Sequence, residues 1–377
     1  MTQTQSPSLA RLTRLRAQAT DNDWGAYFAR DTSDIAWLTA FDGVFDDEQA
    51  HALFVDANEA VLHTDSRYAH ACRTAARMND GIIAVDDGRA THAAFAAKRW
   101  RSRPENNGAF AFDDGITLAN YRALERAFAE GETAAPTFAE THEVVLRLRA
   151  VKDAHEVERM RYAQSITDAA FAYIVTFIRP GRTEREVQQE LDNYMLAHGA
   201  TALAFPSIVA AGENGASPHA QVTDQPLQAG TCIVMDFGAK ARGYCSDMTR
   251  TVFLGEPDAR MREAYETIRR ANEEVEAMLK PGITGVQAQE LAERILEEGG
   301  FGGTMGHGLG HGVGLDIHEL PVLNARNSEP LVPGNVVTVE PGIYLPGEFG
   351  MRLEDCGIVT DNGFDVFTAS SHSPVIL

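Results

Sequence analysis

The sequence contains few cysteines, and they form no metal or disulfide motif. Only four of the 377 residues are cysteines, namely Cys72, Cys232, Cys245 and Cys356. None of them has CxxC spacing, which excludes a zinc ribbon, and their wide separation does not indicate a disulfide framework. Cys232 and Cys245 lie in apolar segments typical of strands. We therefore expect reduced cysteines in a hydrophobic core.

Long apolar runs and basic residues are also scarce. No run of about 18 apolar residues exists to span a bilayer, and the first fifteen residues lack the apolar core of a signal peptide. The chain has 33 Lys and Arg against 54 Asp and Glu, a formal charge of −21, whereas nucleic-acid binding needs clustered positive charge. We expect a cytoplasmic protein that binds neither membrane nor nucleic acid.

The composition is that of a globular protein large enough for roughly two domains. Hydrophobic residues make up 44% of the chain, a normal fraction for a folded protein. In residues 1–146, short apolar segments such as 52–57 and 60–65 alternate with Ala-rich helical stretches, which predicts a small α/β domain. Helical periodicity then predicts one long helix over 147–178. We therefore place the second domain at 147–377.

The second domain repeats a local pattern. Segments 179–196 and 280–296 both follow a predicted helix and have Pro-Gly as their second and third residues. Thr183 or Thr284 then follows as the N-cap, with a Glu or Gln three residues later, the signature of a capping box. A β-rich segment with two acidic residues comes after each. Chance similarity of short amphipathic helices is the simple alternative, but the repeated order favours an internal duplication with a pseudo-twofold axis.

The first β-rich segment brings two aspartates together. Asp236 and Asp247 are symmetric about the bond between Ala241 and Arg242. A hairpin centred there would set the two carboxylates directly opposite, with Cβ atoms ~4.5–5.5 Å apart, where like charges repel. A cation between them would relieve that repulsion.

The second β-rich segment repeats the arrangement with two glutamates. Glu340 and Glu354 are symmetric about Gly347. Each acid taken alone is consistent with a solvated strand residue. However, the segments CIVM and VVTV, which precede Asp236 and Glu340, are typical of buried strands, where an unpaired carboxylate is costly. Four carboxylates related by a pseudo-twofold axis therefore predict a site for one or two divalent ions.

These four acids and one histidine resemble the five-ligand set of the pita-bread metallopeptidases. The set is Asp236, Asp247, His311, Glu340 and Glu354. Within that family the chain is similar to Xaa-Pro dipeptidases (prolidases) and Xaa-Pro aminopeptidases. The segments DIAWLTAF (34–41) and TDSRYAHAC (64–72) resemble a creatinase-type N-terminal domain, and AVKDAHEVERMRYA (150–163) resembles the entry into the catalytic domain.

The resemblance implies an α+β protein of two domains. Residues 1–146 would form a small α/β creatinase-like domain. Residues 147–377 would form the pita-bread catalytic domain, a pseudo-twofold, curved antiparallel sheet with outer helices. The family also implies a homodimer.

The resemblance further implies a dinuclear metal centre. Asp247 and Glu354 would serve both ions, Asp236 would hold one ion, and His311 and Glu340 would complete the other. Mainly oxygen ligands favour Mn²⁺, with Co²⁺ or Zn²⁺ as alternatives. Two ions ~3.5–4 Å apart can hold a bridging hydroxide that attacks the substrate carbonyl. Glu340 would act as general base.

Other positions match residues that face the substrate in the family. His219 and His318 match catalytic imidazoles that contact the scissile carbonyl or its tetrahedral intermediate. His307 matches a pocket position. Arg352 would orient an acid or meet a substrate carboxylate, and Tyr344 would line the pocket. A histidine beside glycines is more often structural than functional, so these roles depend on the five-ligand set.

The remaining histidines have no partner at a useful spacing. Among them are His51, His92, His142 and His372. We therefore predict that these four imidazoles are surface groups.

Hydrolysis of an Xaa-Pro bond, in dipeptides or at peptide N-termini, is the leading functional hypothesis. A methionine-type aminopeptidase would share the ligand pattern but normally lacks an N-terminal domain of this size. A creatinase-type amidinohydrolase would have both domains but would not keep the five ligands. The non-enzymatic alternative is a pita-bread binding module that has lost catalysis. Proline-containing peptides are the expected substrates.

Overall fold

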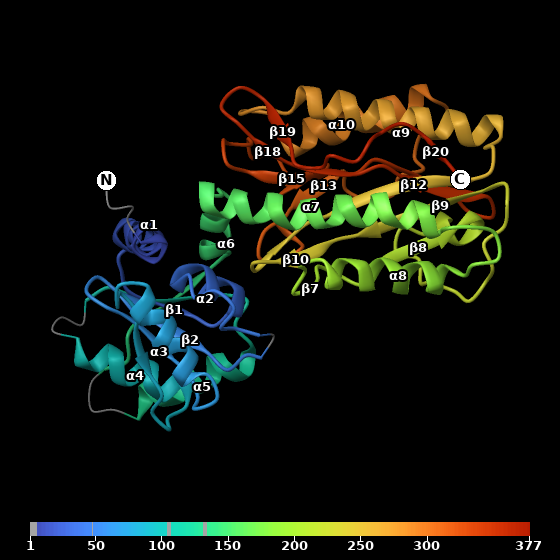
Figure 1. Ribbon diagram of the computed structural model, residues 1–377. Coiled ribbons are helices and arrows are strands. Elements are labelled where there is room, and N and C mark those ends of the chain that lie inside the picture. Colours follow the sequence, from blue (N-terminus) through green and yellow to red (C-terminus); the bar gives the residue numbers. More distant parts are fainter. Residues whose placement is uncertain (1–5, 47, 104–106, 131–133) are drawn as a thin grey trace, which may run out of the picture. The chain divides into compact units, whose positions relative to one another are not determined.

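The computed structural model describes residues 6–46, 48–103, 107–130 and 134–377. The chain divides into two compact units, Met1–Arg149 and Ala150–Leu377, which carry blue-to-teal and green-to-red colours in Figure 1. The boundary expected from the sequence, between residues 146 and 147, falls within helix α6 (Val144–Arg149), the last helix of the first unit.

The first unit is built on a six-stranded mixed sheet with strand order β4-β3-β2-β1-β5-β6. The β1–β2 and β2–β3 pairs are antiparallel, and the other three pairs are parallel. Its strands are β1 (Trp24–Ala29), β2 (Ala52–Asp56), β3 (Ala60–His63), β4 (Ala84–Asp86), β5 (Ala109–Asp113) and β6 (Phe138–Thr141). Its other helices are α1 (Pro7–Asp21), α2 (Thr32–Thr39), α3 (Ala69–Met78), α4 (His92–Ser102) and α5 (Leu118–Ala129).

Aromatic side chains form much of the core of this first unit. Phe28, Phe54 and Phe110 of the sheet pack with Trp100 of α4 and Phe128 of α5. Burial of such large rings is the main stabilising contribution in a domain of this size. The unit is thus the small α/β domain that the alternating pattern predicts.

The long helix of the second unit is shorter than its apolar periodicity predicted. Helix α7 (Ala154–Phe177) begins at Asp153, whose side chain accepts hydrogen bonds from the amides of His155 and Glu156. The prediction of a continuous helix over 147–178 was therefore wrong at its start. Val151 instead forms a β-bridge with Asn335, so the chain between α6 and α7 is extended.

The two Pro-Gly units adopt the same local structure. Helices α8 (Glu184–Ala197) and α10 (Gly285–Glu298) both start with a complete capping box, as predicted. The preceding glycines make equivalent hydrogen bonds, from Gly181 N to Leu227 O at 3.0 Å and from Gly282 N to Leu331 O at 2.9 Å. Two matched long-range bonds support a true duplication of the fold.

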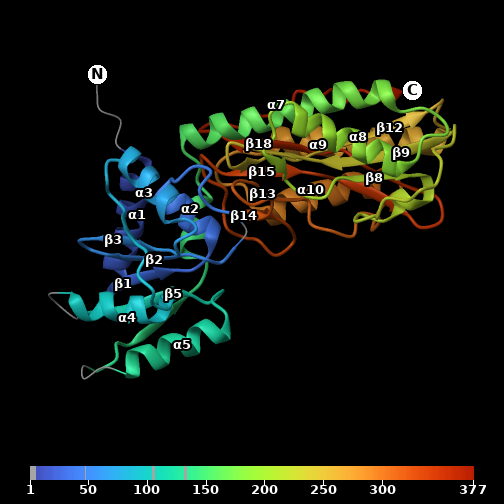
Figure 2. The ribbon, with the colours of Figure 1, turned by 60° about the horizontal axis from the view of Figure 1, so that its bottom comes forward.

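Helices cover the outside of the strands in the second unit. Figures 1 and 2 show α7, α8, α9 (Ala259–Met278) and α10 arranged around the central strands. One hydrophobic cluster joins α7 and α8 to strands β9 and β12, and others join α9 and α10 to strands of the second half. The helices α9 and α10 also pack against Cys232 of β9 and Phe253 of β12, so the apolar faces of the helices meet strands of both halves.

The strands of the second unit belong to four short sheets. Their orders are β11-β10-β7, β20-β12-β9-β8, β14-β13-β15-β18-β19 and β16-β17. In the first half they are β7 (Ala202–Leu203), β8 (Ile208–Ala211), β9 (Thr231–Phe237), β10 (Ala239–Ala241), β11 (Tyr244–Cys245) and β12 (Met248–Leu254). In the second half they are β13 (Gly310–Gly312), β14 (Glu319–Leu323), β15 (Val336–Val339), β16 (Gly342–Leu345), β17 (Phe349–Arg352), β18 (Asp355–Val359), β19 (Phe364–Val366) and β20 (Val375–Ile376).

The first acidic hairpin has a different register from the predicted one. Its turn consists of Arg242 and Gly243, both with positive φ, as in a two-residue hairpin turn. Asp236 consequently pairs with Thr249, and continuation of that register sets Asp247 opposite Gly238. The predicted direct opposition of the two aspartates was wrong by two residues. Since side chains alternate with period two, both carboxylates still lie on one face.

The second acidic hairpin has the predicted register. Val339 pairs with Asp355 in one ladder, and Gly342 pairs with Arg352 in the next. Both pairs are symmetric about Gly347, so Glu340 and Glu354 lie opposite each other between the two ladders. This half of the acidic site follows from the sequence spacing alone.

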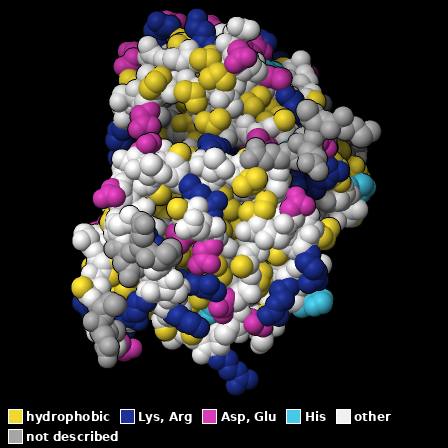
Figure 3. Space-filling view, turned by 90° about the vertical axis from the view of Figure 1, so that its left-hand side faces the viewer, with side chains coloured by type: hydrophobic (Ala, Val, Ile, Leu, Met, Phe, Trp, Pro, Cys, Tyr) yellow, Lys and Arg dark blue, Asp and Glu magenta, His cyan; other side chains and the backbone are white. Residues whose placement is uncertain are grey.

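Charged side chains of both signs are mixed on the surface shown in Figure 3. Lys and Arg alternate there with Asp and Glu, among hydrophobic and other polar groups. None of the helices in the described ranges has the length and apolar character needed to span a bilayer.

Candidate metal centre

Five strands or strand ends deliver the predicted ligands to one cavity. Asp236 lies in β9, Asp247 just before β12, His311 in β13, Glu340 just after β15 and Glu354 just before β18. All five side chains line the same cavity of about 470 Å³. The tertiary fold thus brings together residues that span more than a hundred positions of the chain.

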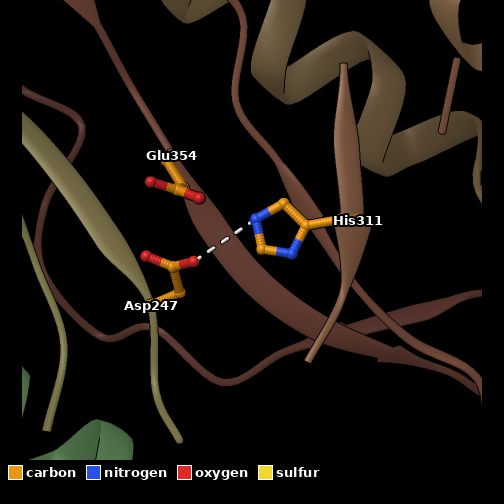
Figure 4. A group of neighbouring side chains, drawn as sticks. All are labelled: Asp247, His311 and Glu354. Atoms are coloured by element: carbon orange, nitrogen blue, oxygen red, sulfur yellow. Dashed lines mark ion pairs between the residues drawn. The ribbon is translucent and has the colours of Figure 1, made fainter. Parts of the chain in front are cut away.

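Three of these residues form the tightest group. Ligand atoms of Asp247, His311 and Glu354 all lie within 4.8 Å of one another, and Figure 4 shows the three side chains converging. The Nε2 atom of His311 lies 3.5 Å from Asp247 Oδ2 and 3.5 Å from Glu340 Oε1. A shared cation would satisfy all four groups at once.

The electrostatics of the carboxylates also fit a divalent cation. Burial and the neighbouring Glu354 raise the pKa of Asp247 well above its ordinary value, and burial with Glu340 does the same for the pKa of Glu354. The Oδ1 atom of Asp236 is buried without a hydrogen-bond partner. Buried carboxylates with raised pKa values and an unpaired oxygen are the donors that a bound metal ion would stabilise.

The backbone orients His311 for metal binding. Its Nδ1 lies 3.0 Å from the carbonyl oxygen of Gly312, which assigns the ring proton to Nδ1 and leaves the Nε2 lone pair toward the carboxylates. Burial lowers the pKa of His311, which favours the neutral ligand form. A Cβ atom at Gly310 would lie only 2.1 Å from Thr338 O, so glycine is required beside this histidine.

Arg352 is buried beside the carboxylates and lines the same cavity. Its Nη2 donates to Asp236 Oδ2 at 2.5 Å, and its Nε donates to Thr249 Oγ1 at 2.9 Å. Thr249 Oγ1 in turn donates to Glu354 Oε2 at 2.6 Å. Of the two roles expected for Arg352, these contacts correspond to orienting an acid.

Tyr344 contacts two residues that line the cavity, Arg352 and His307. Its hydroxyl accepts a hydrogen bond from Arg352 Nη1 at 2.6 Å and lies 3.1 Å from His307 Nε2. Tyr344 is not among the described residues that line the cavity. Its contacts therefore place it in support of Arg352 and His307.

All three histidines expected to face the substrate line the cavity. They are His219, His307 and His318. The rings of His311 and His318 meet edge to face, with centroids 4.4 Å apart. Burial lowers the pKa of His307 and the pKa of His318, so both imidazoles are neutral near pH 7. A neutral imidazole can donate one hydrogen bond to a substrate oxygen.

Comparison with known families identifies this arrangement. Residues 158–361 match metallopeptidase family M24, and residues 11–151 match the creatinase/prolidase N-terminal domain. The chain belongs to metallopeptidase family M24. It is therefore a metallopeptidase of two domains, and membership implies divalent metal ions at the cavity that holds Asp247, His311 and Glu354.

Relatives of this M24 chain match it over nearly its whole length. An uncharacterized peptidase of Bacillus subtilis (strain 168) is 33% identical over 350 residues, which cover 92% of this chain and 94% of the relative. The structure of an Xaa-Pro dipeptidase from Bacillus anthracis is 33% identical, with a TM-score of 0.90, and the match covers 98% of this chain and 100% of the other. The structure of an X-Pro aminopeptidase from Thermotoga maritima MSB8 is 30% identical, with a TM-score of 0.85. The match covers 97% of this chain and 99% of the other. The predicted creatinase-type and pita-bread domains are confirmed.

Two threonines of the M24 site were missed at the level of sequence. Thr249 bonds to Glu354 and Arg352, as described above. Thr338 Oγ1 accepts from the amide of His311 at 3.0 Å and lies 3.2 Å from Glu340 Oε1. Strand alternation could have identified them, because a residue two positions from a ligand lies on the same face of the strand. Thr249 is two positions from Asp247, and Thr338 is two positions from Glu340.

Three of the four histidines expected at the surface are instead partly or fully buried. His51 is fully buried and lies 2.9 Å from Thr64 Oγ1. His92 Nδ1 lies 2.7 Å from His63 Nδ1. His372 Nε2 lies 2.7 Å from Asp355 Oδ2. The prediction holds only for His142, which is exposed although its Nδ1 lies 3.0 Å from Asp114 Oδ2. The burial of the other three follows from packing between segments, which spacing along the chain does not indicate.

His372 belongs to a charged network behind Glu354. Arg250 donates to the carbonyl oxygen of Glu354 at 2.6 Å and to Asp355 Oδ1 at 2.7 Å. Asp355 then contacts His372, whose other ring nitrogen lies 3.3 Å from Glu273 Oε1. The network anchors the C-terminal segment to the backbone of a metal-ligand candidate.

Replacing His372 with Gln is expected to destabilise the protein most at low pH. The hydrogen bond with Asp355 raises the pKa of His372, so its stabilisation is complete below pH ~6.5 and is lost as the pH rises through the folded-state value. A buried charged hydrogen bond contributes about 2 kcal/mol. Urea unfolding at pH 6 and pH 9 measures the change. An equal loss of unfolding free energy at both pH values would contradict a charged pair.

Proposed function

We propose that the protein hydrolyses the peptide bond between any residue Xaa and proline, in dipeptides or at peptide N-termini. The complete five-ligand set in one cavity is the observation that carries this proposal. Relatives named Xaa-Pro dipeptidase and X-Pro aminopeptidase support it. The complete set also weighs against an inactive binding module, and the creatinase/prolidase domain weighs against a methionine-type aminopeptidase.

Asp236, Asp247, His311, Glu340 and Glu354 would hold two divalent ions. Four carboxylates and a single imidazole favour Mn²⁺, with Co²⁺ or Zn²⁺ as alternatives. When bound, such ions lower the pKa of a water molecule and polarise a carbonyl group.

Glu340 is the proposed proton carrier. Burial raises its pKa, although Arg352 and His307 oppose that shift. A raised carboxyl pKa suits a group that first accepts a proton from the attacking water and then donates it to the leaving proline nitrogen. The hydroxyl of Thr338 holds one carboxylate oxygen in place.

His219 and His318 are the proposed donors to the scissile carbonyl oxygen. Both line the cavity that contains the acids. An N–H donor aimed at the oxygen stabilises negative charge that develops as the carbonyl becomes tetrahedral. His307, supported by Tyr344, would complete the substrate-facing wall.

Removal and restoration of metal test the proposed function directly. We expect protein treated with a chelator to lose hydrolysis of whichever of Gly-Pro and Gly-Pro-Xaa it cleaves, and to recover it with Mn²⁺ or Co²⁺, because the bound ions would activate the attacking water. Hydrolysis rates and bound metal per chain are the measurements. Activity indifferent to chelation would reject the proposal. Comparing the two substrates decides between a dipeptidase and an aminopeptidase.

The proposed enzyme is a homodimer, as the resemblance to its family implies. Light scattering of the full chain during size-exclusion chromatography tests this state, and a monomer mass would reject it.

A further inference from the structure

The loop of residues 211–223 forms one wall of the cavity. Pro218, His219, Ala220 and Gln221 of this loop line the cavity. The loop contains a short 3₁₀ helix, Gly212–Ala216. The position of His219 relative to the substrate therefore depends on how this loop is held.

Glu184, at the start of α8, closes both ends of the loop. Its Oε1 accepts from the amide of Ala211 at 2.7 Å, and its Oε2 accepts from the amide of Thr223 at 2.7 Å. Oε2 also accepts from Thr223 Oγ1 at 2.8 Å and from Asn214 Nδ2 at 2.9 Å. One carboxylate thus ties together the first, a middle and the last residue of the loop.

Glu184 is buried, with 2% of its surface exposed. A buried carboxylate is costly unless it is fully hydrogen-bonded, and here four donors satisfy it. As the first residue of α8, it also meets the positive end of the helix dipole. The arrangement specifies a hydrogen-bond acceptor with two oxygens at this position, because an apolar side chain would leave the amides of Ala211 and Thr223 without this partner.

The second half of the unit shows that this carboxylate is not a general requirement of the fold. The equivalent position in α10, one residue after the N-cap Thr284, is Gly285. A Cβ atom there would lie 2.6 Å from Val322 O, so the cavity-lining segment around Val322 packs directly on the helix. The first half instead keeps a gap that the Glu184 side chain bridges.

A neighbouring position is matched between the two halves. Gln188 of α8 donates to Ser207 O at 2.6 Å, and Gln289 of α10 accepts from the amide of Leu309 at 2.7 Å. Each glutamine thus binds backbone next to residues that line the cavity. Both helices hold cavity walls, and only α8 uses a carboxylate to hold the wall that carries His219.

We propose that Glu184 is a positioning residue that sets His219 against the substrate. It acts through the 211–223 loop and touches neither metal ligands nor substrate. The inference rests on the proposed function in one respect, namely that His219 donates to the scissile carbonyl.

Glu184→Gln tests this role with little change in size. The amide group keeps one acceptor oxygen but presents an NH₂ group to donors that need an acceptor. We expect kcat to fall about 10- to 100-fold with little change in KM, on whichever of Gly-Pro and Gly-Pro-Xaa the wild type hydrolyses, because the donor acts on the transition state. Bound metal should stay unchanged. Glu190→Gln is the matched control, since Glu190 lies on the same helix but contacts Tyr173 of α7.

A double-mutant cycle with His219→Ala separates positioning from general destabilisation. If Glu184 acts through His219, Glu184→Gln lowers kcat much less in the His219→Ala background than in the wild type. An equal loss in both backgrounds, or no loss in the wild type, would overturn the proposal. Glu184→Asp, which keeps the charge, should recover part of the activity.

Amide hydrogen exchange provides a readout independent of catalysis. Faster exchange at Ala211 and Thr223 in Glu184→Gln, with α8 otherwise protected, is expected because both amides lose their acceptor. Unchanged exchange would overturn the proposal even if activity fell. Absence of any Xaa-Pro hydrolysis by the wild type would reject the proposed function and the catalytic role of His219, while exchange still shows whether Glu184 holds the loop.

Discussion

Replacing Glu340 with Gln is expected to lower kcat on an Xaa-Pro peptide by about 10³-fold. The change removes the group that would carry the proton, and general acid–base catalysis typically contributes about 10²- to 10⁴-fold. It also replaces one anionic oxygen of the metal centre, which adds to the loss. Steady-state kinetics on Gly-Pro, with saturating Mn²⁺ in the assay, measure the effect.

Bound metal distinguishes the two contributions of Glu340. If Glu340→Gln binds as many ions per chain as the wild type yet loses activity, proton transfer accounts for the defect. Glu348→Gln is the control, since Glu348 lies in the same hairpin but pairs with Arg260 at the surface. A Glu340→Gln variant with more than a tenth of wild-type activity would contradict the role of Glu340 as general base.

The metal-free protein is expected to lose stability as the pH rises above about 4. Burial and repulsion by neighbouring carboxylates raise the pKa values of Asp247 and Glu354 in the folded state. In the unfolded chain these groups release their protons near pH 4. Above that pH the folded state therefore holds more protons than the unfolded state, and the free energy of unfolding falls until the folded-state pKa values are passed.

Bound metal should reverse this trend. Metal binding requires deprotonated carboxylates, so affinity rises with pH. An ion at 1,000 times its Kd would stabilise the folded state by about 4 kcal/mol. Thermal unfolding of stripped and Mn²⁺-loaded protein at pH 5, 6, 7 and 8 measures both effects. We expect the difference in Tm to widen with pH.

Asp247→Asn provides the matched variant for this experiment. An amide removes one negative charge without changing the size of the side chain, so the stripped variant should depend less on pH than the stripped wild type. It should also gain less stability from Mn²⁺. A Tm difference between loaded and stripped wild type that stays constant from pH 5 to 8 would contradict the linkage.

Local features of the fold were predictable because they depend on neighbouring residues. The capping boxes at Thr183 and Thr284 each use residues three positions apart, so the pattern indicates the helix start directly. The apolar period of α7 likewise identifies its buried side. Its start was misjudged because helical periodicity alone does not exclude the extended segment before Asp153.

Part of the candidate site was likewise predictable from spacing along the chain, and part was not. The opposition of Glu340 and Glu354 follows from their symmetric spacing, since an antiparallel ladder pairs residues that are equidistant from its turn. The same argument misplaced Asp236 relative to Asp247. The turn there falls one residue further along, at Arg242 and Gly243, and a one-residue shift of the centre moves each partner by two positions.

By itself, the sequence indicated the two-domain order, the duplicated helices and the four clustered acids, because spacing and local hydrogen bonding carry that information, and its resemblance to the pita-bread family added His311 as the fifth candidate ligand. Only the tertiary structure decided which distant groups hold the site in place. Arg250, Asp355 and His372 meet behind Glu354, and Glu184 reaches the loop of His219. Their partners lie from 17 to more than 100 positions away in the chain. No local pattern specifies such contacts, since they arise when separately formed helices and strands pack together.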